Sequence, residues 1–466
     1  MSKSKELPNC TYPCEPVTKI PPSAPTPKHS LYLSNLDDQK FLRFSIKYLY
    51  IFKKSVNLNN LKSSLSRVLV DYYPLAGRLR RCSSSLDDDI DDEKKLEVDC
   101  NGKGALFVEA FMDITADELV EQSKLPNKSW RKFLYKVEGQ SFLDVPPLVV
   151  QLTSLTCGGM ILCTAINHSL CDGIGTSQFL HAWAHLTTSP QTNLAIPPSH
   201  SRHVLHPRQP PIVNLHNPTY TRTQPHPQIN IHKSIQSQPL IPTSFTFNSA
   251  HILYLKKQCT PSLKCTTFEV IAAHTWRSWI RSLNLPLSLP STLNVKLLFS
   301  VNFRTFMNLP KGYYGNGFLL ACAESKIEDL VGNNNNLHYV VKLVQKAKST
   351  VNDEEYIRST VDLLEDKMVK TDVSTSLVIS QWSKLGLEDV DFGEGKPLHM
   401  GPLTSDVYCL FLPVIGGGGD GVRVVVSVPE SMVESFEYQM SESWEEKMEN
   451  GDKVMNGFHA NEISLL

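Results

Sequence analysis

The stretch "MILCTAINHSLCDGIGTSQFLHAWAHLTT" (residues 160–188) carries the strongest structural signal in the chain. It opens with an apolar run that predicts a buried strand, and its second half places Phe179, Trp183 and Leu186 at helical spacing. Between them lies "NHSLCDG", in which a histidine is followed four residues later by an aspartate and then by a glycine. His168 is therefore expected where a strand ends and a helix begins, a position from which side chains often face a cleft.

Several chemistries compete for this stretch. Taken alone, the H-x-x-x-D spacing is common enough that a core histidine with an acidic neighbour is favoured over a catalytic base. "GIGTSQ" imitates a dinucleotide fingerprint, but Gln178 stands where the third glycine belongs. Cys171 is disfavoured as a nucleophile activated by His168, because it lies three positions away at a strand end, where side chains point in different directions.

The composition excludes several functional classes. The chain has 466 residues, enough for two or three domains, and 41% of them are hydrophobic. Its formal net charge is -1 without a long basic run, which argues against nucleic-acid binding. No apolar stretch reaches membrane-spanning length, and the N-terminus lacks the apolar segment of a secretory signal. The eleven cysteines form no C-x-x-C pair, so we expect reduced thiols and a cytoplasmic protein.

Patterns around the central stretch predict further elements in the first half. Residues 58–79 place apolar side chains on one helical face before Pro74 and Gly77. Residues 96–112 predict two strands around an Asn-Gly turn, and residues 146–167 predict a hairpin. The acidic run at 82–95 is expected to be a solvated loop, because it lacks the glycine and the final glutamate of a calcium loop.

Residues 189–243 differ in composition from the rest of the chain. They are rich in proline and histidine and show no periodicity, which predicts a crossover linker. We predict no metal site, because no cysteine or acidic partner at zinc spacing accompanies the linker histidines His200, His203, His206, His216 and His226. The chain is thus expected to divide into an N-terminal domain (1–188), a linker (189–243) and a C-terminal domain (244–466).

The second half has its own start and strand signals. Thr266 and Glu269 stand at capping-box spacing in front of a predicted helix. Residues 293–304 predict a strand. Residues 405–430 predict two strands around a glycine turn, and this turn is no phosphate loop, because a strand follows it where a phosphate loop requires a helix.

Several motifs, taken together, resemble one family. "HSLCDG" resembles the H-x-x-x-D-G signature of the BAHD acyltransferases, plant enzymes that transfer acyl groups from coenzyme A. Other stretches resemble the same family in the same order along the chain: "LYLSNLDD" (31–38), "YYPLAGRL" (72–79), "VDCNGKGALFVEA" (98–110), "TTFEVIAAHTWRS" (266–278), "KGYYGNGF" (311–318) and "DFGEGKP" (391–397). Matches dispersed over almost the whole chain are far more specific than any one of them.

The resemblance implies a fold and a reaction. The fold would be α/β, a two-domain chloramphenicol acetyltransferase-like architecture in which each domain has a mixed sheet with helices and a tunnel runs between them. His168 would lie in the tunnel as a general base, with acyl-CoA and the acceptor entering from opposite faces. Transfer would be direct, in a ternary complex, with the coenzyme A thioester as co-substrate and no bound cofactor or metal.

The resemblance also implies roles for single residues. Asp172 would turn away from His168 and pair with Arg304, which supports the catalytic loop. Gly173, Ser380 and Trp382 would line the tunnel, with Gly173 leaving room for acyl-CoA and the Ser380 hydroxyl facing the oxyanion or the acceptor. The structural motif comprises Asp391, Phe392, Gly393 and Gly395. Glu394 departs from the family, which has tryptophan there, and we interpret this as a tolerated replacement in a loop.

The substrates are less well defined by the sequence. We expect transfer of a hydroxycinnamoyl, aromatic or aliphatic acyl group to a hydroxyl acceptor, and residues 397–414 faintly resemble members that act on fatty alcohols or hydroxy fatty acids. Two alternatives are acylation of an amine and a non-catalytic relative that acts as a partner in fatty-acyl elongation. The presence of both His168 and Asp172 favours an enzyme, which we expect to be a monomer.

Overall fold

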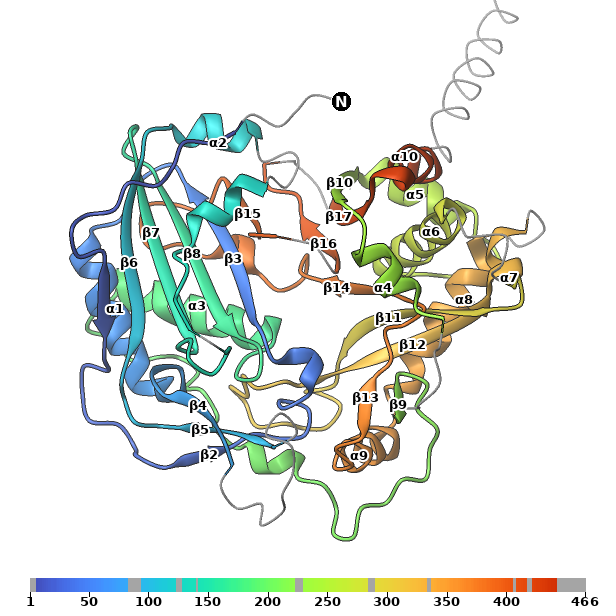
Figure 1. Ribbon diagram of the computed structural model, residues 1–466, viewed down its shortest axis with the longest axis horizontal. Helices are drawn as coiled ribbons and strands as arrows, with labels where there is room; N and C mark the ends of the chain where they lie inside the picture. The colour runs from blue at the N-terminus through green and yellow to red at the C-terminus, as the bar shows by residue number, and fades with distance from the viewer. Residues whose placement is uncertain are drawn as a thin grey trace, which may run out of the picture.

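Two six-stranded sheets lie beside each other in the computed structural model, and most of the helices lie on the outer sides of the pair (Figure 1). The structure describes residues 6–82, 94–122, 128–139, 141–222, 229–283, 290–332, 337–404, 408–416 and 421–441. Most of the predicted acidic loop, part of the predicted glycine turn and His226 lie outside these described residues.

The first sheet is built mainly from the N-terminal half. Its strands, in spatial order, are β1 (Val17–Ile20), β6 (Ala105–Met112), β7 (Leu148–Leu155), β8 (Met160–Asn167), β3 (Ser45–Phe52) and β15 (His399–Pro402). β6 and β7 run parallel and the other neighbours run antiparallel, so the sheet is mixed. Leu148 pairs with Ile166 in the β7–β8 hairpin, which confirms the hairpin predicted over 146–167.

The second sheet comes from the C-terminal half. Its strands, in order, are β10 (Leu240–Phe247), β17 (Val422–Pro429), β16 (Cys409–Pro413), β14 (Ser376–Gln381), β11 (Asn294–Asn302) and β12 (Phe318–Lys326). β14 runs parallel to both of its neighbours, β11 and β16, so this sheet is mixed as well. β16 and β17 pair antiparallel, as the two strands predicted in 405–430 require.

Smaller elements complete the fold. A three-stranded sheet contains β2 (Ser30–Tyr32), β5 (Leu96–Asp99) and β4 (Arg78–Arg81), and β9 (Tyr220–Arg222) pairs with β13 (Val369–Thr371). The helices are α1 (Leu58–Asp71), α2 (Ala116–Gln122), α3 (Gly173–Thr188), α4 (Ile231–Gln236), α5 (Ser249–Lys257), α6 (Thr267–Ser282), α7 (Ile327–Val331), α8 (Leu337–Thr350), α9 (Glu354–Leu363) and α10 (Val433–Ser441). No helix in the described ranges is long and apolar enough to cross a membrane.

Helix ends agree with the local sequence signals. The Asp172 side chain accepts a hydrogen bond from the Gly175 amide and caps α3. Thr266 and Glu269 form the predicted capping box at the start of α6. The helix predicted from residue 58 ends at Asp71, and a 3₁₀ turn follows it through Pro74.

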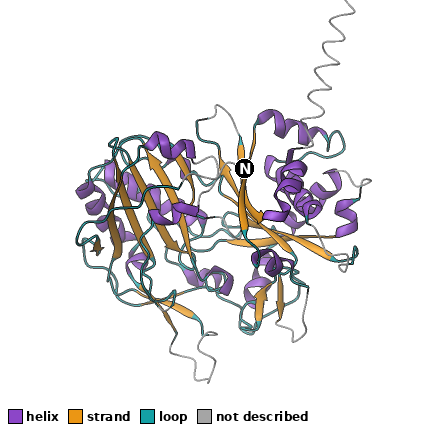
Figure 2. Cartoon of the chain, turned by 45° about the horizontal axis from the view of Figure 1, so that its top comes forward, coloured by secondary structure: helices purple, strands orange, loops and turns teal. Residues whose placement is uncertain are grey.

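Alternation along the strands gives each sheet one face that packs against its longer helices. On β3, Tyr48 and Tyr50 belong to the core cluster that includes α1 and α3, whereas Leu49 and Ile51 belong to a cluster on the opposite face. On β11, Leu297 packs in the cluster with α6 and α8, and Leu298 lies in a small cluster on the other face. Figure 2 shows the helices gathered mainly outside the two groups of strands.

Two sequence interpretations need correction. The strands predicted in 96–112 exist as β5 and β6, but they belong to different sheets and do not pair around the Asn-Gly turn. The backbone at Gly104 lies against Ile20, the last residue of β1, where the chain coming from the three-stranded sheet enters β6. The proposed division of the chain also has an exception, because β15 from the C-terminal half pairs with β3 and closes one edge of the first sheet.

Candidate active site

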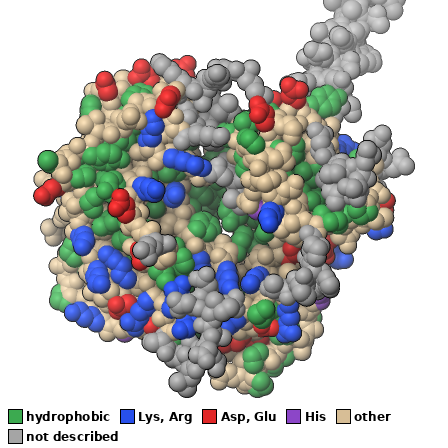
Figure 3. All heavy atoms as spheres, in the orientation of Figure 1, with side chains coloured by type: hydrophobic (Ala, Val, Ile, Leu, Met, Phe, Trp, Pro, Cys, Tyr) green, Lys and Arg blue, Asp and Glu red, His purple; other side chains and the backbone are tan. Residues whose placement is uncertain are grey.

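A cavity of about 1050 Å³ lies between the two sheets, on the faces opposite those that pack against α3 and α6. Val149 and Ala165 line it from the first sheet, and Ser300 and Val378 line it from the second. In the space-filling view the molecule is hollowed between its two halves, with hydrophobic and basic side chains around the opening (Figure 3). His168 lies on the wall of this cavity.

His168 is the first residue after β8. Its amide donates a hydrogen bond to the Phe44 carbonyl at 2.8 Å, so its main chain is fixed beside the start of β3. Its half-buried imidazole lies between two aromatic rings, with centroids 5.5 Å from Phe44 and 6.0 Å from Phe318. The ring therefore has apolar neighbours from both halves of the chain and faces a space large enough for a substrate.

Burial controls the titration of this histidine. Loss of solvent around the imidazole lowers the pKa of His168 below its ordinary value. Its own carbonyl, the charge of Asp172 and the Asn316 side chain act in the opposite direction and raise that pKa in part. A histidine with a lowered pKa is neutral near pH 7, which is the form that can accept a proton.

Asp172 is fully occupied by partners other than His168. Arg304 donates from Nη2 to both carboxylate oxygens at 2.8 Å. The amides of Gly175 and Gly317 donate to the same carboxylate at 2.9 and 3.1 Å. No hydrogen bond connects Asp172 with the His168 ring in the described part of the chain, so the geometry does not form a histidine–aspartate dyad of the triad type.

Three residues expected at the tunnel line the cavity together with His168. They are Gly173, Ser380 and Trp382. A Cβ atom at position 173 would lie 2.7 Å from Leu385 Cδ1, so the space next to this glycine is occupied by a leucine that itself lines the cavity. Trp382 packs against Tyr48 with ring centroids 4.7 Å apart, which places the end of β14 beside β3.

The "DFGEG" motif lies apart from the cavity and folds into a tight loop. Asp391 accepts hydrogen bonds from the amides of Gly393 and Gly395 at 2.7 and 3.0 Å. Both glycines have positive φ angles, 107° and 104°, which a residue with a side chain rarely adopts. Phe392 is buried, with its ring centroid 5.0 Å from that of Trp183 in α3.

Glu394, the departure from the family pattern, points away from this core. Its carboxylate lies 3.7 Å from Lys54 Nζ, and both side chains are largely exposed to solvent. The glutamate therefore sits on the surface and is not among the residues that line the cavity.

Neither the Cys171 thiol nor a metal-binding cluster forms a second site among the described residues. Cys171 is completely buried, and burial raises the pKa of its thiol well above the ordinary value, which keeps the sulfur protonated. Within the described ranges, no group of three or more histidine, cysteine or acidic side chains is arranged to hold a metal ion.

A buried polar cluster under His168 was not predicted from the sequence. Asp37 accepts hydrogen bonds from Arg202 and Asn316, and these two side chains also donate to carbonyls of the loop that carries His168. Asp37 and Asn316 lie within two of the quoted family stretches, "LYLSNLDD" and "KGYYGNGF", which was the signal available. Arg202 lies in the proline-rich linker, where composition gave no sign of a buried guanidinium.

Comparison with known proteins supports this picture. Residues 16–443 match the family model described as "Transferase family". The chain is 35% identical over 447 residues to alcohol acyl transferase 1 (allele GSa) of Malus domestica, covering 92% of this chain and 94% of that protein. It is 33% identical to omega-hydroxypalmitate O-feruloyl transferase of Arabidopsis thaliana, covering 90% of both chains.

Solved structures share the fold. Vinorine synthase superposes with a TM-score of 0.67 at 22% identity, covering 91% of this chain and 96% of its own. TRI101 of F. graminearum, solved with coenzyme A and T-2 mycotoxin, superposes with a TM-score of 0.70 at 15% identity, covering 87% and 96%.

Two mixed sheets with a cavity between them, and a histidine at the end of β8, give this chain the fold shared with vinorine synthase and TRI101. The sequence matches specify it further: the chain belongs to the Transferase family, whose plant members are the BAHD acyltransferases, and it is an O-acyltransferase.

Proposed function

We propose that this protein transfers an acyl group directly from a coenzyme A thioester to the hydroxyl group of an alcohol, with His168 as the general base. The observation that carries the proposal is the position of His168 on the wall of a cavity that both sheets line. A neutral imidazole there can take the hydroxyl proton as the oxygen attacks the thioester carbonyl, help that is typically worth about 10²–10⁴-fold in rate.

The remaining steps need no covalent enzyme intermediate. Attack produces a tetrahedral intermediate whose oxyanion needs a hydrogen-bond donor, and the Ser380 hydroxyl is our candidate because it lines the same cavity. Collapse of the intermediate breaks the carbon–sulfur bond and releases the ester. The proton held by the imidazolium of His168 then leaves with the coenzyme A thiolate.

The lining of the cavity favours a substrate with an apolar body. Aromatic side chains of Phe41, Phe44, Phe318 and Tyr408 line it near His168, and the aliphatic residues Val149 and Val378 line it elsewhere. Such a surface gains free energy by burying an acyl chain or the hydrocarbon part of an alcohol, at about 25 cal/mol per Å². We therefore propose aliphatic or aromatic alcohols, hydroxy fatty acids included, as acceptors.

The donor is proposed to bind without any resident cofactor or metal. Lys47, Lys136 and Lys384 also line the cavity and offer positive charge to the phosphates of coenzyme A. We further propose that the enzyme acts as a cytoplasmic monomer in which the segment 189–243 connects the domains 1–188 and 244–466.

The experiment is a screen of acyl-CoA donors against alcohols, hydroxy fatty acids and amines, with free coenzyme A and products followed by mass spectrometry. Coenzyme A should appear only when an alcohol is present, and a chelator should leave the rate unchanged. His168→Ala should lower turnover at least about a hundredfold, the usual contribution of a general base. Its melting temperature should change little, because the ring is half-buried beside an open cavity.

His338→Ala is the matched control, because His338 lies on α8, away from the cavity lining. This variant should keep wild-type turnover. If the screen yields acylated amines and no esters, the proposed O-acylation is wrong and N-acylation takes its place. No acceptor-dependent release with any donor would favour a non-catalytic partner in acyl elongation instead.

A further inference from the structure

The loop that carries His168 is held by side chains from three other segments. Asn316 Nδ2 donates to the His168 carbonyl at 2.8 Å. Arg202 Nη2 donates to the Leu170 carbonyl at 2.7 Å. Arg304 binds Asp172, as described above. The first two contacts are made by Asn316 and Arg202, which both belong to the buried cluster centred on Asp37.

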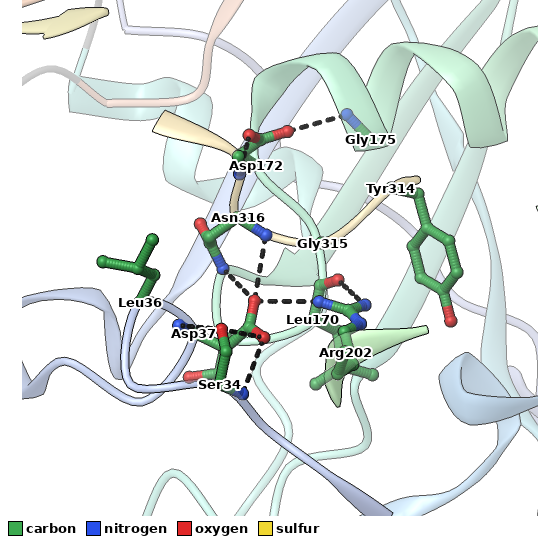
Figure 4. Close-up of polar contacts among 12 residues, drawn as sticks. Ser34, Leu36, Asp37, Leu170, Asp172, Gly175, Arg202, Tyr314, Gly315 and Asn316 are labelled. Carbon is green, nitrogen blue, oxygen red and sulfur yellow. Dashed lines mark hydrogen bonds and ion pairs between the residues drawn. The ribbon is translucent and has the colours of Figure 1, made fainter. Parts of the chain in front are cut away.

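Asp37 is the centre of this buried cluster. One carboxylate oxygen accepts hydrogen bonds from Arg202 Nη1 at 2.8 Å and from both the amide and the Nδ2 of Asn316 at 2.9 Å. The other oxygen accepts from the amide and hydroxyl of Ser34 at 3.0 and 2.7 Å. Figure 4 shows Asp37 between Ser34, Asn316 and the Arg202 guanidinium, which extends to the Leu170 carbonyl.

The cluster is sealed from solvent, so its geometry is tightly constrained. The side chains of Arg202 and Asp37 are 1% and 0% exposed, and Asn316 is fully buried. A buried ion pair contributes little net stability, because desolvation offsets the attraction between the charges. The pair nevertheless restricts the motion of its two side chains, and this fixes the position of any group that is hydrogen-bonded to them.

Asn316 connects this rigid centre to the catalytic loop. A carboxamide nitrogen carries two protons, and here one is donated to Asp37 and the other to the His168 carbonyl. Asn316 Oδ1 and His168 Nδ1 are both buried and have no hydrogen-bond partner in the described residues. The Asn316 side chain also raises the pKa of His168, against the larger effect of burial, so it acts on the imidazole as well as on the main chain.

We propose that Asn316 is a positioning residue for the His168 imidazole, and that the buried Asp37–Arg202 pair holds Asn316 in place for this task. The proposal rests on the proposed function, because it gives His168 the role of base. With its amide bonded to Phe44 and its carbonyl bonded to Asn316, His168 is fixed on both sides of its Cα atom. Without Asn316, the carbonyl loses its partner and the ring can turn from the acceptor hydroxyl.

The test compares Asn316→Ala with the wild-type enzyme, using one donor and one acceptor found in the screen. The kcat should fall at least about tenfold, because small displacements of a reacting group cost up to about 10²-fold in rate. The KM for acyl-CoA should stay within about threefold, well below the tenfold change that 1.4 kcal/mol of binding energy would produce. The acidic limb of the kcat/KM profile should move to lower pH, because a contact that raises the His168 pKa is lost.

Asn217→Ala is the matched control. Asn217 is also buried, but its side chain bonds Thr360 in α9 instead of the catalytic loop. Whatever its melting temperature, the control should keep kcat within about twofold of wild type and the acidic limb in place. If Asn316→Ala does not fold, Asn316→Ser replaces it, since a hydroxyl has one proton and cannot donate to Asp37 and His168 together.

Three outcomes would overturn the positioning role: a kcat within threefold of wild type, an unmoved acidic limb, or an equal loss of kcat in Asn217→Ala. A wild-type protein with no acceptor-dependent turnover would overturn the proposed function and this inference together. Normal turnover of the Asn316 variants in an active enzyme would overturn this inference alone.

Discussion

Among single residues, His168 shows how burial and local charge together set the state of a proposed base. Burial lowers the pKa of its imidazole, and Asp172 and Asn316 limit this decrease. Asp172 does so from within its ion pair with Arg304, so the compensating effect of its charge is smaller than that of a free carboxylate. The result is a histidine that is neutral near pH 7 and still basic enough to accept a proton.

The pH dependence of kcat/KM follows from this direction. Neutral His168 is the active form, so activity should be complete above its pKa and should fall tenfold per pH unit below it. Because burial lowers the pKa of His168, the acidic limb should have its midpoint below about 6.5, the ordinary value for histidine. Values of kcat/KM measured between pH 4.5 and 8, in buffers of constant ionic strength, give this midpoint. A midpoint above 6.5 would contradict the assignment of His168 as the base.

Among the secondary-structure elements, α3 depends on one residue for two purposes. Asp172 caps the helix by accepting from the Gly175 amide, and it holds Arg304 from the segment after β11. The side chains of Arg304 and Asp172 are 12% and 5% exposed, so the pair is largely desolvated. A substitution of Asp172 therefore removes both the cap of α3 and the ion pair that holds the catalytic loop.

Asp172→Ala should consequently cost more than loss of a helix cap. Removal of one member of a buried ion pair costs about 3–5 kcal/mol, because Arg304 is left without its partner. Asp172→Asn should be milder, since its amide oxygen can still accept from Gly175. Urea denaturation of both variants measures the difference in the free energy of unfolding.

Asp353→Ala provides the comparison for a cap alone. Asp353 caps α9 by accepting from the Tyr356 amide, and no ion pair of Asp353 is present in the described residues. This change should cost about 1 kcal/mol, the usual value of an N-cap. If Asp172→Ala lowers the free energy of unfolding no more than Asp353→Ala does, the Asp172–Arg304 ion pair does not contribute to stability.

At the scale of the whole molecule, each sheet packs its longer helices on one face, and the cavity lies between the two opposite faces. Both cores bury histidines in this arrangement. His274 in α6 is fully surrounded, and burial lowers its pKa to about 4. His399 in β15, packed edge-on to Trp130, has its pKa lowered to about 3 for the same reason.

These buried histidines should make the fold sensitive to mild acid. Below about pH 6.5 the unfolded chain protonates histidines that the folded chain keeps neutral, so each one removes about 1.4 kcal/mol of unfolding free energy per pH unit. Burial raises the pKa of Asp38 to about 6 and also raises that of Asp71, and both groups act in the opposite direction. They are outweighed because His200, whose pKa burial lowers to about 4, acts together with His274 and His399. The free energy of unfolding should therefore decrease as the pH falls from 6.5 towards 4.

Denaturant titrations followed by tryptophan fluorescence at pH 7, 6 and 5 will measure this decrease. His274→Gln should flatten it, because glutamine can still donate to the Met440 carbonyl but does not titrate. Asn217→Ala, which removes a buried side chain that does not titrate, should leave the pH dependence as it is. A stability that rises from pH 7 to pH 5 would show that groups other than the histidines dominate.

The sequence by itself determined the local elements and much of the site. Apolar runs and helical spacing predicted β8 and α3 around His168, and the capping box of α6 could be read from Thr266 and Glu269, because these signals depend on neighbours a few residues apart. The match of dispersed motifs to one family then supplied Arg304 as a partner for Asp172, which spacing alone could not give.

Tertiary structure decided what depends on distant parts of the chain. Asp37 bonds Arg202 and Asn316 across 165 and 279 positions, and no local pattern records such a contact. β15 joins the first sheet although it follows the strands of the second in sequence, since strand pairing is selected by the free edge of β3 and not by proximity along the chain. The cavity lies between two sheet faces that come from different halves of the chain, a property of packing that no single segment encodes.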